Sequence, residues 1–347
     1  MPQKSTLKWW LLGVGSALLL MLALFLPLPY YIEMPGGAYD IRQVLQVDNK
    51  VDKAKGSYRF VAISQMRATF AGLVYAWLTP FTDVSTAKES LGRYTEEEYL
   101  RLNQFYMETS QHEAIYQAFK LAEKPVELTY FGVYVLDVSK QSTFKGILGL
   151  ADTVTGVNGN TFESSKELID YVSKQTLGDP VTVQYLSNNQ AKEASGKIIK
   201  LDNGKNGIGI GLVDHTAVDT KIPVDFSTGN VGGPSAGLMF TLDILDQINT
   251  EDLRKGRMIA GTGTIEKDGS VGDIGGTGKK VVSAAKDGVD IFFVPNNPVP
   301  KAYLKEHPDA KTNYQEAKEA AKRIKTKMTI VPVKNVQEAI DYLRATS

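Results

Sequence analysis

The feature that most constrains this chain is an uncharged, apolar run near its N-terminus. No residue from Trp9 to Ile32 carries a charge, and the stretch 11–26 is almost wholly apolar. An α-helix rises about 1.5 Å per residue, so this run can cross the roughly 30 Å hydrocarbon core of a bilayer. We therefore expect a transmembrane anchor at 9–32, with the lipid bilayer as its partner.

The residues around this run predict its orientation. The nearest charged residues are basic before the run, Lys4 and Lys8, and acidic after it, Glu33 and Asp40. Aromatic residues lie near both ends, namely Trp9, Trp10, Tyr30 and Tyr31. Basic residues favour the cytoplasmic side, and Trp and Tyr favour the two interfaces. A cleaved signal peptide is the alternative, but the run exceeds an ordinary signal core and Pro27–Tyr30 is no A-x-A-like cleavage site. We expect a cytoplasmic segment at 1–8, one crossing of the cell membrane, and extracytoplasmic residues from 33 onward.

The composition excludes several classes of function. Lys plus Arg and Asp plus Glu both total 39 in the 347 residues, so no basic excess points to nucleic acid. The chain has no cysteine, which excludes a thiolate nucleophile, disulfides and Cys-bound zinc. Its histidines, His112, His215 and His307, are too scattered for a metal cluster. We expect no nucleic acid partner, no metal and no cofactor.

Hydrophobic patterning gives a coarse prediction for region 33–126. Residues 39–47 and 58–64 alternate as strands do, and 96–122 is predicted as a helix with an acidic first turn. The apolar run 68–78 is too short to cross a membrane. We interpret it as a buried core helix.

Region 127–200 changes character and resembles a PDZ domain. Short Val-rich strands bracket a helix at 164–173, and the stretch 146–159 matches that family's turn, aspartate, strand and Asn-Gly hairpin, with Ala151 where the family usually has Gly. The residues Tyr130, Phe131, Gly132 and Val133 resemble the PDZ loop that holds a peptide carboxylate, beside an edge strand that accepts the peptide. The helix would form the other wall of the groove.

A glycine-rich segment further on can present a nucleophile. Residues 229–237 read Gly-Asn-Val-Gly-Gly-Pro-Ser-Ala-Gly and lead into an apolar helical run, 238–248. Glycines such as Gly233 allow a sharp turn, Pro234 restricts φ before Ser235, and the free N–H groups of a first helical turn can face an oxyanion. Ser235 as an ordinary helix N-cap is the alternative.

A second motif lies downstream. Strand 259–265 and a turn-rich hairpin, 269–276, precede Lys280, which lies 45 residues after Ser235. Together with Gly-Pro-Ser-Ala-Gly, these segments resemble the Lon-type protease domain, whose lysine follows a Gly-Gly pair by four residues. The resemblance covers about 201–347 and implies a serine endopeptidase in which Ser235 is the nucleophile, Lys280 the base, and Thr262 a threonine that hydrogen-bonds the lysine.

Lys280 can act as a base only when it is neutral. The ordinary pKa of lysine is about 10.4, so burial must lower it by several units. The apolar residues that follow it, Val281, Val282, Ala284 and Ala285, favour such burial, whereas Lys279 is expected to point to solvent. In the expected cycle Ser235 attacks the peptide carbonyl, backbone N–H groups including its own stabilise the oxyanion, and Lys280 carries the proton to the leaving amine.

Some positions depart from the larger Lon enzymes. Gly232 stands where they usually have Asp, and 221–225 lacks the histidines of their preceding strand. The segment 276–280 has some likeness to a Walker A loop, but Asp273 occupies the required first glycine position and no Ser or Thr follows Lys279. We therefore expect an enzyme that works without ATP and cuts only extended or loosely folded segments.

The order of anchor, PDZ domain and Lon-like domain resembles the YlbL-type proteases of Gram-positive bacteria. The expected fold class is α+β, a Lon-type domain of mixed sheets and helices at 201–347 with the PDZ domain at 127–200 inserted into it or preceding it. Region 33–126 is then either the first part of a discontinuous catalytic domain or a separate domain.

The same resemblance implies substrates and partners. These are small membrane-tethered proteins, including a cell-division inhibitor made after DNA damage, captured by the PDZ domain near the membrane. Lon-like domains form rings, so a homo-oligomer is expected by analogy. The alternative function is a catalytically idle PDZ scaffold at the membrane, against which the complete set of Ser235, Thr262 and Lys280 argues.

Overall fold

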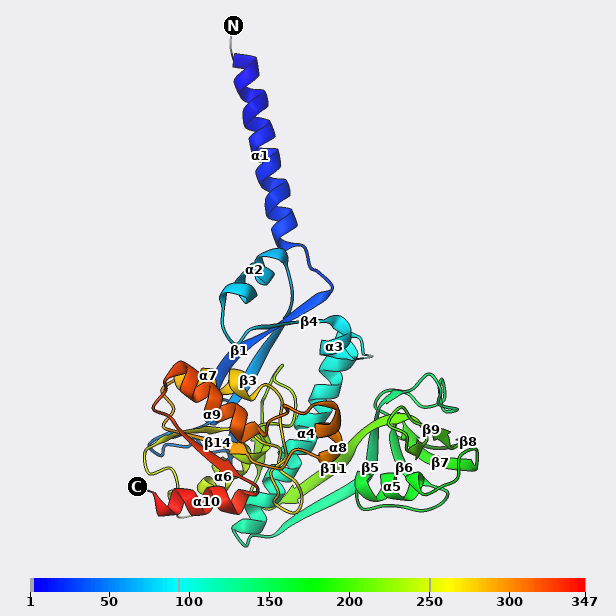
Figure 1. Ribbon diagram of the computed structural model, residues 1–347. Coiled ribbons are helices and arrows are strands. Elements are labelled where there is room, and N and C mark those ends of the chain that lie inside the picture. The colour runs from blue at the N-terminus through cyan, green and yellow to red at the C-terminus, as the bar shows by residue number, and fades with distance from the viewer. Residues whose placement is uncertain (1–2, 93, 250, 347) are drawn as a thin grey trace.

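The computed structural model describes residues 3–92, 94–249 and 251–346, and within this part the side chains of 3–8, 19, 20 and 22 are not described. Helix α1 (Gln3–Phe25) projects from a body that carries two main sheets (Figure 1). The other helices are α2 (Phe70–Leu78), α3 (Ala87–Leu91), α4 (Glu96–Leu121), α5 (Ser165–Ser173), α6 (Gly237–Ile248), α7 (Thr277–Lys286), α8 (Lys301–Glu306), α9 (Asn313–Ile324) and α10 (Val336–Ala345).

The first sheet has the strand order β15-β14-β13-β3-β1-β4. Its strands are β1 (Tyr30–Asp40), β3 (Ser57–Arg67), β4 (Asp83–Thr86), β13 (Met258–Gly261), β14 (Ile291–Pro295) and β15 (Thr329–Val333). Strand β3 pairs antiparallel with β1 and parallel with β13, with Arg59 opposite Ala260. The N-terminal and C-terminal parts of the chain therefore build one sheet.

The second sheet has the order β11-β5-β6-β7-β8 and comes from the segment between those two parts. Its strands are β5 (Val126–Val138), β6 (Thr153–Val157), β7 (Pro180–Ser187), β8 (Gln190–Lys197) and β11 (Ile210–Thr220). Strands β5 and β11 form a long antiparallel ribbon that joins this sheet to the body (Figure 1). Two small pairs complete the fold, β9 (Ile199–Lys200) with β10 (Asn206–Gly207) and β2 (Leu45–Val47) with β12 (Val224–Phe226).

The residues that resemble the PDZ carboxylate-binding loop, Tyr130, Phe131, Gly132 and Val133, lie within strand β5 rather than in a loop. Of these residues, Tyr130, Gly132 and Val133 pair with β11, and only Val133 also pairs with β6. The free edges of this sheet are β8 and β11. Gly132 has φ +138°, and a Cβ at this position would come within 2.0 Å of the Val154 carbonyl oxygen. The glycine therefore permits a close approach of two strands.

The main core lies between the first sheet and α6, with α4 packed across it. Helix α4 begins at a capping box in which Thr95 and Glu98 satisfy each other's backbone N–H groups, which explains the sharp start predicted at 96. Helix α6 is buried almost throughout, and Leu238, Met239 and Phe240 are fully buried. The same α4 also contacts β5 and β11, so it bridges the two sheets.

The interpretation of 68–78 as a buried core helix is wrong. Helix α2 buries only Ala76, whereas Trp77 is 85% exposed. It stands beside the base of α1, outside the main core (Figure 1). A run of apolar residues predicts a helix that avoids water, but it does not say whether protein or another apolar phase covers it.

The predicted anchor at 9–32 differs from the structure at its end. Helix α1 ends at Phe25, before two prolines, and the nearly fully buried Tyr31 and Ile32 already belong to β1. Of the predicted cytoplasmic segment 1–8, residues 1 and 2 and the side chains of 3–8 lie outside what the structure describes. Among the residues that are described, no helix is both long enough and apolar enough to span a bilayer.

Candidate active site

Ser235 lies in the loop that leads into α6. The N-cap of α6 is Ala236, and no side chain caps this end, so Ser235 is not an N-cap. Gly233 has φ +89°, a conformation that favours glycine. The Ser235 backbone N–H donates no hydrogen bond within the described residues, so it is free to face an oxyanion.

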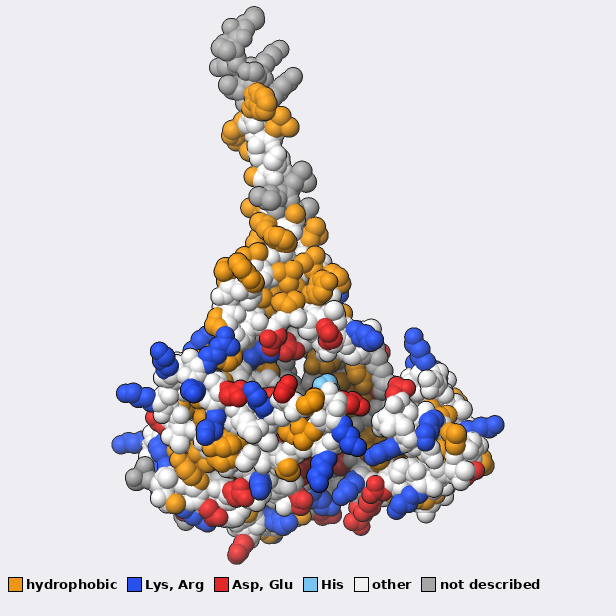
Figure 2. Space-filling view, in the orientation of Figure 1, with side chains coloured by type: hydrophobic (Ala, Val, Ile, Leu, Met, Phe, Trp, Pro, Cys, Tyr) orange, Lys and Arg blue, Asp and Glu red, His pale blue; other side chains and the backbone are white. Residues whose placement is uncertain are grey.

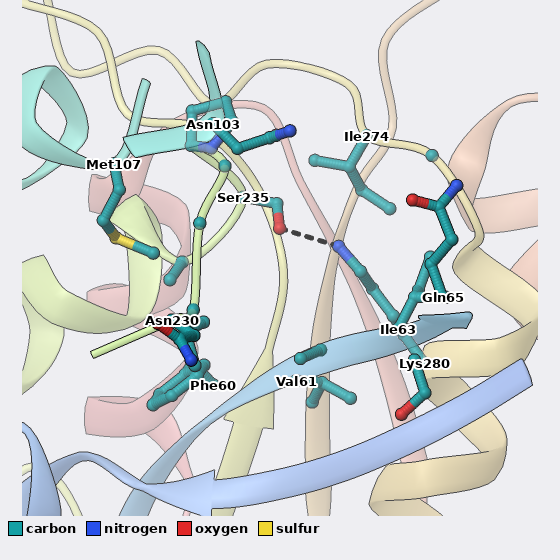
Figure 3. Close-up of a pocket in the computed structure, with 18 of the residues that line it drawn as sticks. Phe60, Val61, Ile63, Gln65, Asn103, Met107, Asn230, Ser235, Ile274 and Lys280 are labelled. Carbon is teal, nitrogen blue, oxygen red and sulfur yellow. Dashed lines mark hydrogen bonds between the residues drawn. The ribbon is translucent and has the colours of Figure 1, made fainter. Parts of the chain in front are cut away.

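Lys280 extends from the first turn of α7 directly toward this serine (Figure 3). Its Nζ lies 2.8 Å from Ser235 Oγ and 3.0 Å from Thr262 Oγ1. The residue is only 4% exposed, and this burial lowers the pKa of Lys280 to about 7. No carboxylate in the described part of the chain forms an ion pair with it. A substantial fraction of the amine is therefore neutral near pH 7.

Thr262 orients both members of the pair. It follows β13, and its N–H donates to the Phe293 carbonyl of β14 over 3.0 Å, which holds the backbone in place. Its hydroxyl donates to the Ser235 carbonyl oxygen over 3.2 Å and accepts from the Lys280 amine. With these directions assigned, the nitrogen lone pair of a neutral Lys280 can point at the Ser235 hydroxyl.

The expectation that Lys279 points to solvent is wrong. It is only 8% exposed, and its Nζ forms ion pairs with Glu33 of β1, at 3.4 Å, and with Asp83 of β4. Successive residues of an α-helix point about 100° apart. The two lysines therefore face different pockets, and Lys280 faces the serine.

Helix α4 supplies contacts that the sequence reasoning missed. The Asn103 carbonyl accepts the Gly233 N–H over 2.8 Å, and Ser110 Oγ donates to the Pro234 carbonyl over 2.9 Å. A Cβ at Gly232 would lie 2.7 Å from Asn103 Cβ, so the loop can approach α4 this closely only with glycine there. No local pattern links residues more than 120 positions apart, as Ser110 and Pro234 are.

Asn313, at the start of α9, was also missed. Its amide nitrogen donates to Thr277 Oγ1 over 2.9 Å and to the Ile274 carbonyl over 2.8 Å, and its oxygen accepts the Ile274 N–H over 2.9 Å. These bonds hold the glycine-rich turn that begins α7. A Thr-x-x-Gln capping box at Thr312 could have predicted the helix start, but not the contact.

The serine and the lysine open onto a cleft of about 700 Å³. Its lining includes Asn103 and Met107 of α4, Ile274, and the segment 61–65 of β3 (Figure 3). Strand β13 pairs only with Ser57–Phe60 of β3, so beyond Phe60 that edge of β3 has no strand partner among the described residues. Tyr130, Phe131, Gly132 and Val133 do not line this cleft.

Comparisons with known proteins identify two domains. Residues 104–198 match the family model of the PDZ domain, and residues 191–345 match that of the Lon protease (S16) C-terminal proteolytic domain. Both matches begin at a different residue from the predicted boundaries.

The curated relatives of this chain include Lon proteases. The Lon protease of Aster yellows witches'-broom phytoplasma is 26% identical over 32% of this chain, and that of Ureaplasma parvum serovar 3 is 28% identical over 48%. These matches span 12% and 21% of the relatives' own length.

Solved structures match the PDZ segment. The PDZ domain of an SdrC-like protein from Listeria monocytogenes is 36% identical and covers 25% of this chain and 93% of its own, with a TM-score of 0.24. The corresponding domain from Listeria innocua is 40% identical over 24% and 96%, with a TM-score of 0.23. By the two family models, the chain is similar to the PDZ domain over 104–198 and to the Lon protease (S16) proteolytic domain over 191–345.

Proposed function

We propose that this chain is an ATP-independent serine endopeptidase that uses Ser235 as nucleophile and Lys280 as general base. The observation that carries the proposal is the 2.8 Å approach of Lys280 Nζ to Ser235 Oγ, together with the burial of this amine away from any carboxylate. An idle scaffold would have no need of a buried lysine whose pKa is lowered to about 7.

The proposed reaction follows from these positions. The neutral amine of Lys280 takes the hydroxyl proton as Ser235 Oγ attacks the carbonyl carbon of the scissile peptide bond. The oxyanion that forms accepts a hydrogen bond from the Ser235 backbone N–H at the start of α6. Lys280 then gives its proton to the leaving amine as the C–N bond breaks. Water hydrolyses the acyl-enzyme in a second round, with Lys280 again as the base.

The substrate backbone is proposed to lie along β3. The unpaired edge that follows Phe60 lines the cleft and leads toward Ser235. An extended peptide can pair with such an edge by backbone hydrogen bonds, whatever its sequence. A folded helix or hairpin cannot, which agrees with an enzyme that cuts loosely folded segments.

The PDZ domain is proposed to capture the protein or peptide substrate along β11. This strand is an edge of the PDZ sheet, and α5 lies against it, with the Ser165 N–H donating to Asp214 Oδ1 over 3.0 Å. A peptide added at Ile210–Val213 would run between strand and helix. This proposed site differs from the carboxylate-binding loop that the resemblance to PDZ domains implies at Tyr130–Val133.

We also propose that α1 anchors the chain in the cell membrane, with the N-terminus in the cytoplasm and both domains outside. In support, α1 exposes large apolar side chains, including Trp9, Trp10 and Phe25. Small membrane-tethered proteins, including a cell-division inhibitor made after DNA damage, are the proposed substrates, and a homo-oligomer is the proposed assembly.

The test uses purified full-length protein in detergent micelles and an unstructured protein as substrate. Wild type is expected to cleave it with and without ATP, whereas Ser235→Ala and Lys280→Ala are expected to be inactive. Lys279→Ala serves as a matched control, because it removes the neighbouring amine from the same helix. Equal cleavage by wild type and both dyad variants would exclude the dyad. Binding without cleavage by wild type would favour the scaffold.

A further inference from the structure

Helix α2 presents an apolar surface to the outside of the protein. None of its nine residues is charged. The exposed side chains on α2, which we call the α2 face, are Phe70, Val74, Tyr75, Trp77 and Leu78. Trp77 is the most exposed of them, at 85%. Single exposed apolar residues are common on soluble proteins, but five on nine consecutive positions indicate a surface that is covered in the working protein.

The structure ties α2 to the base of α1. The Leu28 N–H, just after α1, donates to the Ala68 carbonyl, and the Ala68 N–H donates to the Tyr30 carbonyl, each over 2.8 Å. A small core of Ile32, Ala68 and Ala76 lies beneath them. Helix α2 is therefore attached to the chain where α1 ends. In Figure 2 apolar side chains continue from the base of α1 over this neck.

Charged residues mark where this apolar zone ends. Arg67, two residues before the Thr69 cap of α2, pairs with Glu96 at 3.1 Å. On the other side of α2, Asp83 pairs with Lys279. Figure 2 shows the same boundary as a change from orange side chains on the neck to blue and red side chains below it.

We propose that α2 is an interfacial helix whose α2 face lies in the outer surface of the bilayer that holds α1. The inference rests on the proposed anchor, because the backbone bonds between the two segments place α2 at the point where α1 would leave the membrane. Nine helical residues span about 13 Å, too little to cross but enough to lie in the headgroup region. Trp and Tyr are the residues that favour this depth.

Such a contact would set the height and tilt of the active site above the membrane. Ile32 packs in the small core under α2, and the next residue, Glu33, pairs with Lys279 beside the dyad lysine. One strand, β1, thus connects the α2 face to the cleft. A single anchor helix leaves the body free to tilt, whereas two contacts hold the cleft within reach of segments that emerge close to the bilayer.

Trp77 is a natural probe for this proposal. The chain has three tryptophans, Trp9, Trp10 and Trp77. Full-length protein with Trp9→Phe and Trp10→Phe therefore reports on α2 alone. It would be reconstituted into phosphatidylcholine–phosphatidylglycerol vesicles whose acyl chains are brominated near the headgroup. We expect blue-shifted Trp77 emission that the bromines quench strongly and that aqueous iodide quenches weakly.

The matched control carries the reporter on the body. Tyr303 of α8 is an exposed aromatic residue, so Tyr303→Trp with all three native tryptophans changed to Phe is expected to respond to iodide and not to bromine. Emission from Trp77 that behaves like this control would overturn the proposal. Shielding of Trp77 from both quenchers would also overturn it, because the face would then contact protein, such as a second copy.

Flotation separates this proposal from the proposed anchor. Protein that fails to float with the vesicles would refute the anchor, and the inference with it. Protein that floats while Trp77 stays open to iodide would refute the inference alone. As a second readout, Trp77→Ser with Leu78→Ser should float and cut a soluble unfolded substrate at the wild-type rate. Its cleavage of a substrate tethered to the same vesicles should fall, and an unchanged rate there would contradict the proposal.

Discussion

Lys279 and Lys280 are consecutive residues in the first turn of α7, yet they lie in opposite kinds of pocket. Both are buried, at 8% and 4% exposure. Lys279 meets two carboxylates, Glu33 and Asp83, whereas Lys280 meets two hydroxyls, Ser235 and Thr262. The first amine forms ion pairs, whereas burial without a carboxylate favours the neutral form of the second. Burial alone therefore does not decide the role of a lysine. The groups that contact its amine in the buried pocket decide it.

Replacing each lysine by methionine gives the sharpest test of this contrast. Methionine keeps an unbranched apolar stem and removes the amine. We expect Lys280→Met to lower the rate of peptide cleavage by about 10²–10⁴-fold, the usual contribution of a general base. Initial rates on an unstructured substrate measure this. A variant that keeps a tenth of the wild-type rate would show that another group accepts the serine proton.

The same substitution should stabilise the fold. The pKa of Lys280 is about 7 when folded and 10.5 when unfolded, so the unfolded chain binds more protons between these pH values. The cost of burying a protonated Lys280 therefore lowers the free energy of unfolding in full below pH 7. This cost disappears above pH 10.5, where the amine is neutral in both states. A shift of this size corresponds to at most about 5 kcal/mol. Urea unfolding should show Lys280→Met to be more stable at pH 7 than wild type, with the difference shrinking toward pH 10.

The pH dependence of the rate tests the neutral amine directly. Protonation removes the base, so the cleavage rate of wild type should fall about tenfold per unit as pH drops below about 7, and level off above it. The profile of kcat/KM from pH 5 to 9 measures this. A flat profile would break the proposed difference between the two pockets, while a midpoint near 10 would mean that Lys280 is solvated in the working enzyme.

Thr262→Val should produce a smaller loss. Valine fills the same space but neither accepts from Lys280 nor donates to the Ser235 carbonyl, so the amine loses its orientation. Loss of one neutral hydrogen bond is worth about 0.5–1.5 kcal/mol, which predicts a two- to twelvefold lower kcat with little change in KM. Thr262→Ser, which keeps the hydroxyl, should recover most of the rate. If serine failed to do so, packing rather than hydrogen bonding would explain the effect.

Lys279→Met should have the smallest effect on chemistry. Its partner Asp83 has a largely exposed side chain, so loss of the pair should lower the free energy of unfolding by about 0.5–1 kcal/mol. The cleavage rate should stay within about threefold of wild type, a range that corresponds to less than 1 kcal/mol. Cleavage rates and urea unfolding of Lys279→Met and Lys280→Met, measured side by side, test this. A rate loss as large as that of Lys280→Met would erase the distinction between the two lysines.

Local motifs predicted a large part of the site. The Gly-Gly-Pro-Ser-Ala-Gly segment and the spacing to Lys280 singled out three residues, and the structure brings all three within hydrogen-bonding distance. Helix α4 was predicted to within a residue, because its capping box is a local signal. The contacts that hold the serine loop, from Asn103 and Ser110, were not predicted, since they join distant parts of the chain.

Two interpretations failed for one shared reason. The surroundings of Lys279 and of α2 depend on which distant segment lies against them, namely β4 and the base of α1. Whether region 33–126 belongs to the catalytic domain was left open for the same reason, because the pairing of β3 with β13 joins distant parts of the chain. A hydrophobic pattern indicates which side chains avoid water, but it does not indicate which part of the protein, or which other apolar phase, covers them.

By itself, the sequence determined which residues can do chemistry, because glycine turns, helix starts and residue spacing act over a few positions. Only the tertiary structure decided which lysine is paired with carboxylates and which is isolated beside the serine. That choice depends on desolvation and on partners from β1, β4 and β13, whose positions are set by packing across the whole sheet.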